Sequence, residues 1–228
     1  MPTDRELAVV AGVGPGLGTA LVRCFAQAGM RVACVARNAE RLAVLTQETG
    51  AQAYACDITD ENSVERLFAR LGKEQGAPSL VVHNPSWFVM KPFLELEQAD
   101  VIEAWRIACF GGFLVGRAAA RAMLARGGTI LFTGSTPSIK AGSGFAAFAA
   151  AKFGVRALAQ SMARELGPQG IHVAHVVVDG PIDGPGSEGL KIPKLSPHDI
   201  AENFLALHRQ HRSAWTQELD LRPADAKF

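Results

Sequence analysis

The run GFAAFAAAKFG, residues 144–154, holds a single ionisable side chain, Lys152, among alanine, glycine and phenylalanine. Phe148 comes four residues earlier, which in a helix is one turn back on the same face. Ser135 comes thirteen residues before Phe148, and its hydroxyl can donate one hydrogen bond to an oxyanion. Lys152 can hold a ligand as a compact positive charge. These residues can therefore bind and polarise an oxygen atom, but phenylalanine cannot give it a proton.

A glycine-rich turn, AGVGPGLG at residues 11–18, follows the first apolar run and opens a helical pattern. Gly12, Gly16 and Gly18 form the pattern G-x-x-x-G-x-G, with Leu17 inside it. Glycine lets backbone N–H groups approach a pyrophosphate, and the N-terminus of the following helix favours its negative charge. A tight turn without a ligand is the alternative. Its place between strand and helix favours nucleotide binding.

The second apolar run ends at Val35-Ala36-Arg37, without an acidic residue. A carboxylate at this strand end would accept a hydrogen bond from the adenine ribose, whereas an arginine binds a 2′-phosphate. Arg37 therefore favours NADP(H), with NAD(H) as the alternative cofactor and a solvated arginine as the alternative role.

Asp57 and Ile58 follow the third apolar run. Asp57 can accept from an adenine amino group and Ile58 can pack on the adenine ring. An ordinary helix-capping aspartate explains Asp57 equally well.

Short apolar runs alternate with helical patterns along the whole chain. The runs are continuous and rich in valine and alanine, as in strands buried on both faces, and lie at 7–12, 31–36, 51–56, 80–84, 128–134 and 171–178. We expect helices at 17–28, 38–48, 61–75, about 98–126, 147–166 and 197–210, and a seventh strand from the C-terminal tail. This order predicts an α/β fold, a Rossmann-like doubly wound parallel sheet of about seven strands with helices on both faces.

The length of 228 residues suits one dinucleotide-binding domain over residues 1–228. Its most irregular segment is DGPIDGPGSEGLKIPKLSP, residues 179–197, which is dense in glycine and proline and directly follows a strand. Ligands of such sheets bind beyond the carboxyl ends of the strands, so we expect 179–197 to be a substrate flap.

The composition excludes several classes of function. With 48% hydrophobic and 20% charged residues, the chain reads as an ordinary soluble globular protein. A net charge of +1 gives no reason to expect nucleic acid or a membrane surface as a partner. No signal peptide or apolar run of membrane-spanning length is present, so a cytoplasmic location is expected. The four cysteines form no CxxC pair and have no histidine at ligand spacing, so we expect no metal site.

Taken in this order, the features resemble the short-chain dehydrogenase/reductase family over almost the whole chain. The resemblance rests on the glycine turn at 12–18, Asp57, the His83-Asn84 pair, Ser135 and Lys152. Members reduce carbonyls or oxidise alcohols with a nicotinamide cofactor. The resemblance therefore implies an NADP(H)-dependent oxidoreductase that assembles as a homodimer or homotetramer, with Asn84 and Ile182 among its cofactor contacts.

In that family a tyrosine protonates the substrate, a lysine binds the nicotinamide ribose, a serine bonds the substrate oxygen and an asparagine supports a proton relay. These roles fall on Phe148, Lys152, Ser135 and Ala108. The lysine and the serine are present, whereas the tyrosine and the asparagine are not. Further departures lie near the same pocket, at Pro85, Ser86, Asp179-Gly180 and Gly184.

No other residue is an obvious replacement for the tyrosine. The only tyrosine, Tyr54, lies near the expected adenine end. Enoyl reductases of the family place theirs seven residues before the lysine, and Phe145 occupies that position here. His83, like His172 and His175, is expected to be a core or surface histidine rather than a proton source. Asp179 and Asp183 lie near the pocket mouth, where a role in the turn is favoured.

Two functions remain open from the sequence. The first is an oxidoreductase with an altered active site, low turnover of ordinary carbonyls and a small, apolar substrate. The second is a nucleotide-binding protein without turnover, either a redox sensor or a partner subunit. The apolar residues expected near the substrate are Trp87, Phe88, Phe93, Phe145 and Ile182.

Overall fold

The computed structural model describes residues 5–226, so expectations for residues 1–4 and 227–228 lie outside it. Its seven strands form a parallel sheet in the order β3-β2-β1-β4-β5-β6-β7. They are β1 (Leu7–Ala11), β2 (Arg31–Ala36), β3 (Gln52–Ala55), β4 (Leu80–His83), β5 (Gly128–Thr133), β6 (Ile171–Val178) and β7 (Glu218–Leu221). The expected Rossmann-like sheet is confirmed, including the seventh strand from the tail.

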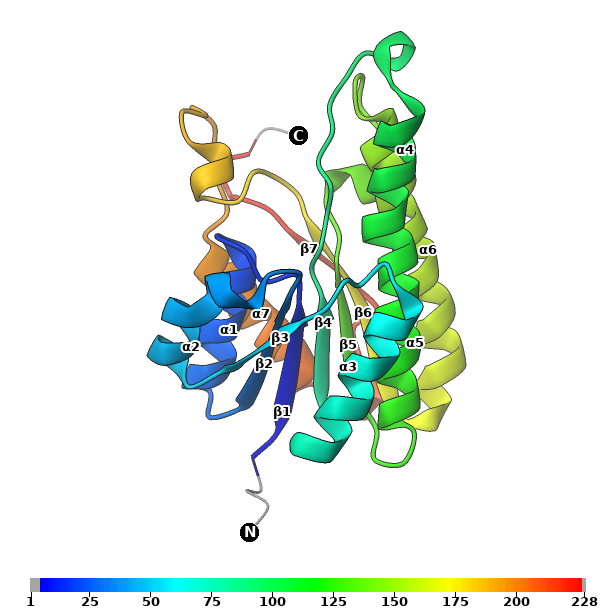
Figure 1. Ribbon diagram of the computed structural model, residues 1–228. Helices are drawn as coiled ribbons and strands as arrows, with labels where there is room; N and C mark the ends of the chain where they lie inside the picture. The colour runs from blue at the N-terminus through cyan, green and yellow to red at the C-terminus, as the bar shows by residue number, and fades with distance from the viewer. Residues whose placement is uncertain (1–4, 227–228) are drawn as a thin grey trace.

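Helices cover both faces of the sheet (Figure 1). One face carries α1 (Leu17–Gln27), α2 (Ala43–Thr49) and α7 (Pro197–His208). The other carries α3 (Glu61–Glu74), α4 (Gln98–Trp105), α5 (Gly111–Met123) and α6 (Ala146–Leu166). Because both faces are covered, the central strands are buried throughout, which explains their continuous apolar runs.

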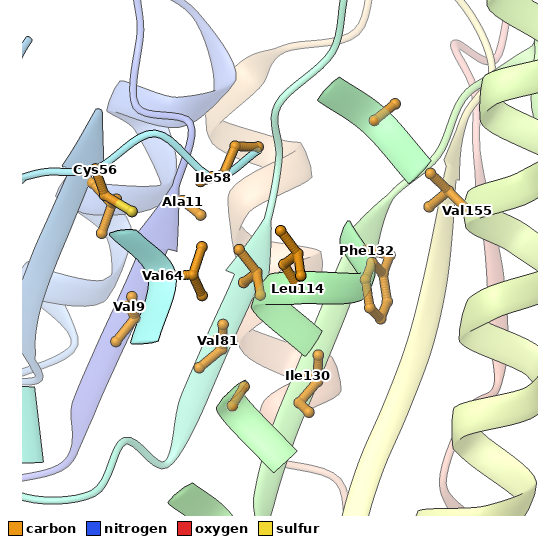
Figure 2. Packing of buried hydrophobic residues seen from close by; sticks show 14 of the residues in the cluster. Val9, Ala11, Cys56, Ile58, Val64, Val81, Leu114, Ile130, Phe132 and Val155 are labelled. Atoms are coloured by element: carbon orange, nitrogen blue, oxygen red, sulfur yellow. The ribbon is translucent and has the colours of Figure 1, made fainter. Parts of the chain in front are cut away.

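The larger core lies between the sheet and the helices α3, α5 and α6. Val81 and Ile130 project from β4 and β5 toward Leu114 of α5 (Figure 2). The ring of Phe132 packs against Gly116 of the same helix. The strand register aligns His83, Phe132 and His175 on β4, β5 and β6. Packing in this core therefore keeps the carboxyl ends of β4, β5 and β6 in register, so the loops that follow them begin side by side.

Local signals for helix ends are confirmed. The Asn38 side chain accepts from the backbone N–H of Glu40 and starts a short 3-10 helix, Ala39–Leu42, which leads into α2. Gly50 ends α2 in the left-handed conformation, with φ of 70°. Ser196 caps α7 through the N–H of Asp199, with Pro197 at the first position.

The expected helix over about 98–126 is helical without a break from Gln98 to Met123, but it is not regular throughout. The segment is α4, then a π-helical turn at Arg106–Phe110, then α5, which ends at Met123. Within this turn the carbonyl oxygen of Ala108 lies 3.0 Å from Nε2 of His83. A carbonyl that bonds outside the helix is a recognised cause of such a bulge. None of the helices described is long and apolar enough to cross a membrane.

Candidate active site

A cavity of about 1190 Å³ lies at the carboxyl ends of the strands. The loops after β1, β2, β3, β4, β5 and β6 all contribute to its lining, and α6 supplies Phe148 and Lys152. The segment 179–197 contributes Ile182, Asp183 and Gly184. The cavity is therefore elongated from the β2 side to α6, as a dinucleotide and a second small ligand would require.

The glycines of the turn differ in their surroundings: two are closely packed and one has open space beside it. Gly12 has φ of 84°, and a Cβ there would lie 2.5 Å from Pro85 Cγ. A Cβ on Gly18 would lie 2.8 Å from the Gly12 carbonyl oxygen. By contrast, a Cβ on Gly16 would meet nothing within 4 Å, although its φ is 95°. Gly12 and Gly18 thus hold the turn, Gly16 lies on an open cradle, and Leu17 begins α1 as a buried residue.

The β2 end of the cavity is basic. Arg37 and Arg41 line it, and within residues 5–226 neither side chain makes a hydrogen bond or ion pair. Arg106 also lines it, but its guanidinium pairs with Glu103 and donates to Thr59 Oγ1. Two arginines are therefore available to an anionic ligand. The sequence pattern predicted only Arg37 as a ligand for the phosphate. Arg41 lies four residues later and matches no pattern that would have predicted this role.

Asp57 and Ile58 both line the cavity. Oδ1 of Asp57 accepts from the backbone N–H and hydroxyl of Thr59 at 2.9 and 2.7 Å. Burial opposes ionisation, but these two bonds outweigh it and hold the pKa of Asp57 below its usual range. Asp60 caps α3, so Asp57 is not the helix cap. Ile58 also packs against Gly111, whose Cβ would lie 2.7 Å from Ile58 Cδ1.

At the opposite end, Lys152 is 3% exposed, and its Nζ donates to the Thr133 carbonyl oxygen at 2.9 Å. Burial lowers the pKa of Lys152 to about 8. Thr133 and Ser135 also line the cavity; their hydroxyl oxygens are buried, and neither finds a hydrogen-bond partner in the described chain. Two unpaired hydroxyls beside an ammonium form a polar site for a ligand oxygen. Thr133 was missed from the sequence, since one more hydroxyl at a strand end carries no pattern.

Aromatic rings surround this polar site. Phe148 lines the cavity, and the ring of Phe88 meets it edge-on at 5.3 Å between centroids. Phe88 also meets Phe145 at 6.1 Å and is itself 66% exposed. Trp87 and Ile182 line the cavity as expected, whereas Phe93 is exposed and does not reach it. Apolar side chains therefore line the same cavity as Ser135.

Asn84 lines the cavity and ties two of its loops together. Its Nδ2 donates to the Gly12 carbonyl oxygen at 3.1 Å, and its backbone N–H donates to Ala11. The loop after β4 is thereby fixed to the glycine turn.

Ala108 does not reach the cavity. It is buried, and its carbonyl oxygen faces Nε2 of His83. Burial, reinforced by the positive charge of Lys152, lowers the pKa of His83 to about 3. A neutral ring must then donate Nε2–H to this carbonyl. His83 is therefore a core histidine, as expected.

Asp179 ties loops together below the cavity. Its Oδ1 accepts from Thr136 Oγ1 at 2.5 Å, and its Oδ2 lies 3.3 Å from Arg222. Thr136 directly follows Ser135, so Asp179 holds the turn that presents the serine. Asp183 lines the cavity and lies 3.3 Å from Lys194. The sequence favoured a role within the turn of its own loop, whereas the Asp179 side chain joins two other segments of the chain.

Tyr54 does not line the cavity that contains Ser135 and Lys152. Its hydroxyl bonds with Gln52, Glu74 and Gln75.

Three of the cysteines, Cys24, Cys34 and Cys56, are buried and unoxidised, and Cys109 is half-buried. Across residues 5–226, no group of three His, Cys, Asp or Glu side chains is arranged to hold a metal ion.

The sheet order and this site define the class of protein, a nucleotide-binding α/β protein of the dehydrogenase type. Comparison with known proteins agrees. A family model described as enoyl-(acyl carrier protein) reductase matches residues 12–218. A sorbitol dehydrogenase of Cereibacter sphaeroides is 30% identical over 194 residues, which are 83% of this chain and 75% of that protein.

Solved structures agree as well. A short-chain dehydrogenase from Rhodopseudomonas palustris is 37% identical, with a TM-score of 0.85 over 96% of this chain and 98% of its own. A metagenomic short-chain oxidoreductase in complex with NADP is 25% identical, with a TM-score of 0.85 over 96% and 97% of the two chains. This chain belongs to the short-chain dehydrogenase/reductase family. Its expected class, an NAD(P)-dependent oxidoreductase, is the class of these relatives.

Proposed function

We propose that the protein is an NADP(H)-binding oxidoreductase with an altered active site. The observation that carries this proposal is the arrangement of one cavity. It has two unpaired arginines at one end, an open glycine cradle in the middle, and Lys152 with Ser135 at the other. The cavity fits the cofactor because its features follow the order of the cofactor's groups. The positive charge would meet the 2′-phosphate, the open backbone the pyrophosphate, and the unpaired hydroxyls the nicotinamide ribose.

Each part of the cofactor has candidate partners. Arg37, with Arg41, would hold the 2′-phosphate, which favours NADP(H) over NAD(H). The turn Gly12, Gly16, Leu17 and Gly18 would hold the pyrophosphate. The remaining contacts are Asp57 and Ile58 at the adenine, Lys152 at the nicotinamide ribose, and Asn84 and Ile182 along the nicotinamide half. When bound, the cofactor supplies hydride chemistry.

The residues beside the reacting atoms distinguish this chain from an ordinary carbonyl reductase. Phe148, at the position we assign to the catalytic tyrosine, cannot donate a proton. Ala108, at the position assigned to the relay asparagine, is buried outside the cavity. Ser135 can still bond a substrate oxygen. A general acid typically contributes about 10²–10⁴-fold, so turnover of simple ketones is expected to be low.

The same site supports an apolar small-molecule substrate. Trp87, Phe148 and Ile182 line the cavity, and Phe88 stands at its rim. Residues 179–197 would act as a flap within a single domain over 1–228, since Ile182–Gly186 line the cavity from above the sheet end.

A homodimer or homotetramer also fits. Ile102, Trp105, Phe113 and Phe153 are large apolar side chains exposed on α4, α5 and α6. Such residues on adjacent helices are suited to cover one another between subunits.

The second candidate is a nucleotide-binding protein without turnover, a redox sensor or a partner subunit. The observation that favours it is the loss of a proton donor, because Phe148 lines the cavity and carries no hydroxyl. It shares the cofactor site with the first candidate, so binding and turnover must be measured separately.

The test is a fluorescence titration of cofactor-free protein with NADPH and with NADH. We expect tighter binding of NADPH, and a loss of about 10- to 100-fold in its affinity in Arg37→Gln, as for a charge-assisted hydrogen bond. The control is Arg126→Gln, an exposed arginine absent from the cavity lining. No binding of either cofactor would overturn both candidates. Reduction of simple ketones at about 1–10³ per second would overturn the altered active site.

A further inference from the structure

A buried histidine beside the candidate site has no role in the function proposed above. His175 lies in β6 and is fully buried. Its strand neighbours are Phe132 in β5 and Glu218 in β7. Nδ1 of His175 lies 3.1 Å from Oε2 of Glu218. Glu218 in turn bonds Arg156 of α6 through both carboxylate oxygens at 2.7 Å. The Glu218 carboxylate therefore orients the His175 ring, and Arg156 in turn fixes the position of that carboxylate.

This arrangement determines which ring nitrogen carries the proton. Burial lowers the pKa of His175 to about 4, so the ring is neutral around pH 7. A carboxylate only accepts hydrogen bonds, so the neutral ring must place its proton on Nδ1. Nε2 is then a bare acceptor. Among residues 5–226 it has no hydrogen-bond partner, although it is buried.

The bare nitrogen lies against the Cα of Gly134, because a Cβ built there would lie only 2.1 Å from Nε2. The carbonyl oxygen of the preceding residue, Thr133, accepts from Lys152 Nζ at 2.9 Å. The imidazole and the ammonium therefore approach two consecutive residues at the end of β5. Glycine at 134 is what leaves room for the ring.

The ammonium of Lys152 has donors to spare. It carries three N–H bonds, and within the described chain only the Thr133 carbonyl accepts one of them. A buried ammonium with so few partners is costly, and so is a buried acceptor without a donor. A single buried water between the two groups would relieve both costs.

We propose that His175, oriented by Glu218, is a positioning residue for Lys152, and that its Nε2 is linked to a second ammonium N–H through one buried water. The third N–H of Lys152 is then directed to the cavity, where the proposed function needs it for the cofactor ribose. This consequence rests on the proposed function, whereas the contact itself does not. The charged groups facing the ring are Glu218 from β7 and Lys152 and Arg156 from α6; β5 contributes only Phe132 and Gly134.

The test uses the full chain without cofactor. Long-range proton–nitrogen spectra of labelled protein report the tautomer of His175, and carbon-labelled lysine reports the titration of Lys152. We expect the Nδ1–H tautomer around neutral pH. In His175→Leu, which removes the acceptor at similar volume, the pKa of Lys152 should fall by about one unit, a tenfold change. In His175→Gln, whose side-chain oxygen can reach the place of Nε2, it should return toward the wild-type value.

A purely structural histidine would leave the Lys152 titration unchanged in a folded leucine variant, and that result would overturn the proposal. An Nε2–H tautomer in the wild type would overturn it as well. If His175→Leu fails to fold, Glu218→Gln decides the matter. Losing the carboxylate should release the tautomer preference and lower the pKa of Lys152, while Arg156→Gln should preserve both. NADPH titrations of the same samples separate failure of the cofactor site from failure of this contact.

Discussion

The ammonium nitrogen of Lys152 lies 5.7 Å from the centre of the Phe148 ring, one turn earlier on α6. Both side chains are buried, so this is a cation beside an aromatic face in a region of low dielectric. The ring can stabilise the charge but has no hydroxyl for the charge to activate. Chemistry at this point therefore depends on what the lysine does for a bound ligand.

Phe148→Tyr should place a phenol beside that ammonium. An adjacent positive charge favours the phenolate, so the introduced phenol should titrate below its ordinary pKa of about 10. Ultraviolet difference titration can follow it cleanly, because burial raises the pKa of Tyr54, the only tyrosine of the chain. Lys152→Met in the same background is the control and should return the phenol to an ordinary or raised value. A phenol titrating above 10 with Lys152 present would contradict the expected geometry.

Gly12→Ala should destabilise the fold and weaken nucleotide binding. The new methyl group would meet Pro85 at 2.5 Å, and φ of 84° is unfavourable for alanine. We expect a loss of about 1–3 kcal/mol in the free energy of unfolding, measured with urea. Gly14→Ala is the matched control, since its Cβ would meet nothing within 4 Å, and should stay within about 0.5 kcal/mol. Equal losses in the two variants would contradict the packing described for the turn.

Burial of Lys152 should appear in the pH dependence of stability. Its pKa falls from 10.5 to about 8 on folding, so between these values the folded state binds fewer protons than the unfolded state. The stability that Lys152 contributes therefore rises with pH across this window, and below it the cost of burying the charge is fully present. Lys152→Met should be more stable than wild type around pH 7, by an amount on the order of 3 kcal/mol.

That advantage should shrink as the pH rises through 8 toward 10.5. Comparing urea unfolding of the two proteins at each pH cancels the titration of all other groups. A constant difference across the window would mean that the lysine keeps its ordinary pKa in the folded protein.

Asp179→Ala should loosen the turn that presents Ser135. The substitution removes the bond from Thr136 and the ion pair with Arg222, and we expect a loss of about 1–3 kcal/mol in unfolding free energy. Asp183→Ala removes only an exposed pair with Lys194 and should change stability by less than about 1 kcal/mol. Urea unfolding measures both changes in unfolding free energy. Equal losses in the two variants would contradict the bracing role assigned to Asp179.

The sequence predicted what local patterns determine. Continuous apolar runs predicted the strands, and Asn38, Gly50 and Ser196 predicted helix ends, because each signal acts within a few residues. The bulge in the helix after α4 was not predictable in this way, since its cause is a histidine from β4 facing Ala108. Contacts between residues distant along the chain require the register of the sheet.

The same reason explains what the sequence missed in the candidate site. His175 and Glu218 are 43 residues apart and become neighbours only when β7 pairs with β6. Asp179 was read as a turn residue, but its partners, Thr136 and Arg222, lie on two other loops. Residue types indicated which side chains could take part in chemistry. Their hydrogen-bond partners depend on the strand order of the sheet, which brings distant residues together.

The place of β7 also bears on how the protein comes to be made. It is the last strand along the chain and pairs only with β6, at the edge of the sheet. During synthesis the glycine turn and β1, β2 and β4 emerge long before Glu218, whereas a domain generally folds as a unit. The imidazole of His175 therefore has no carboxylate partner until the final strand has emerged.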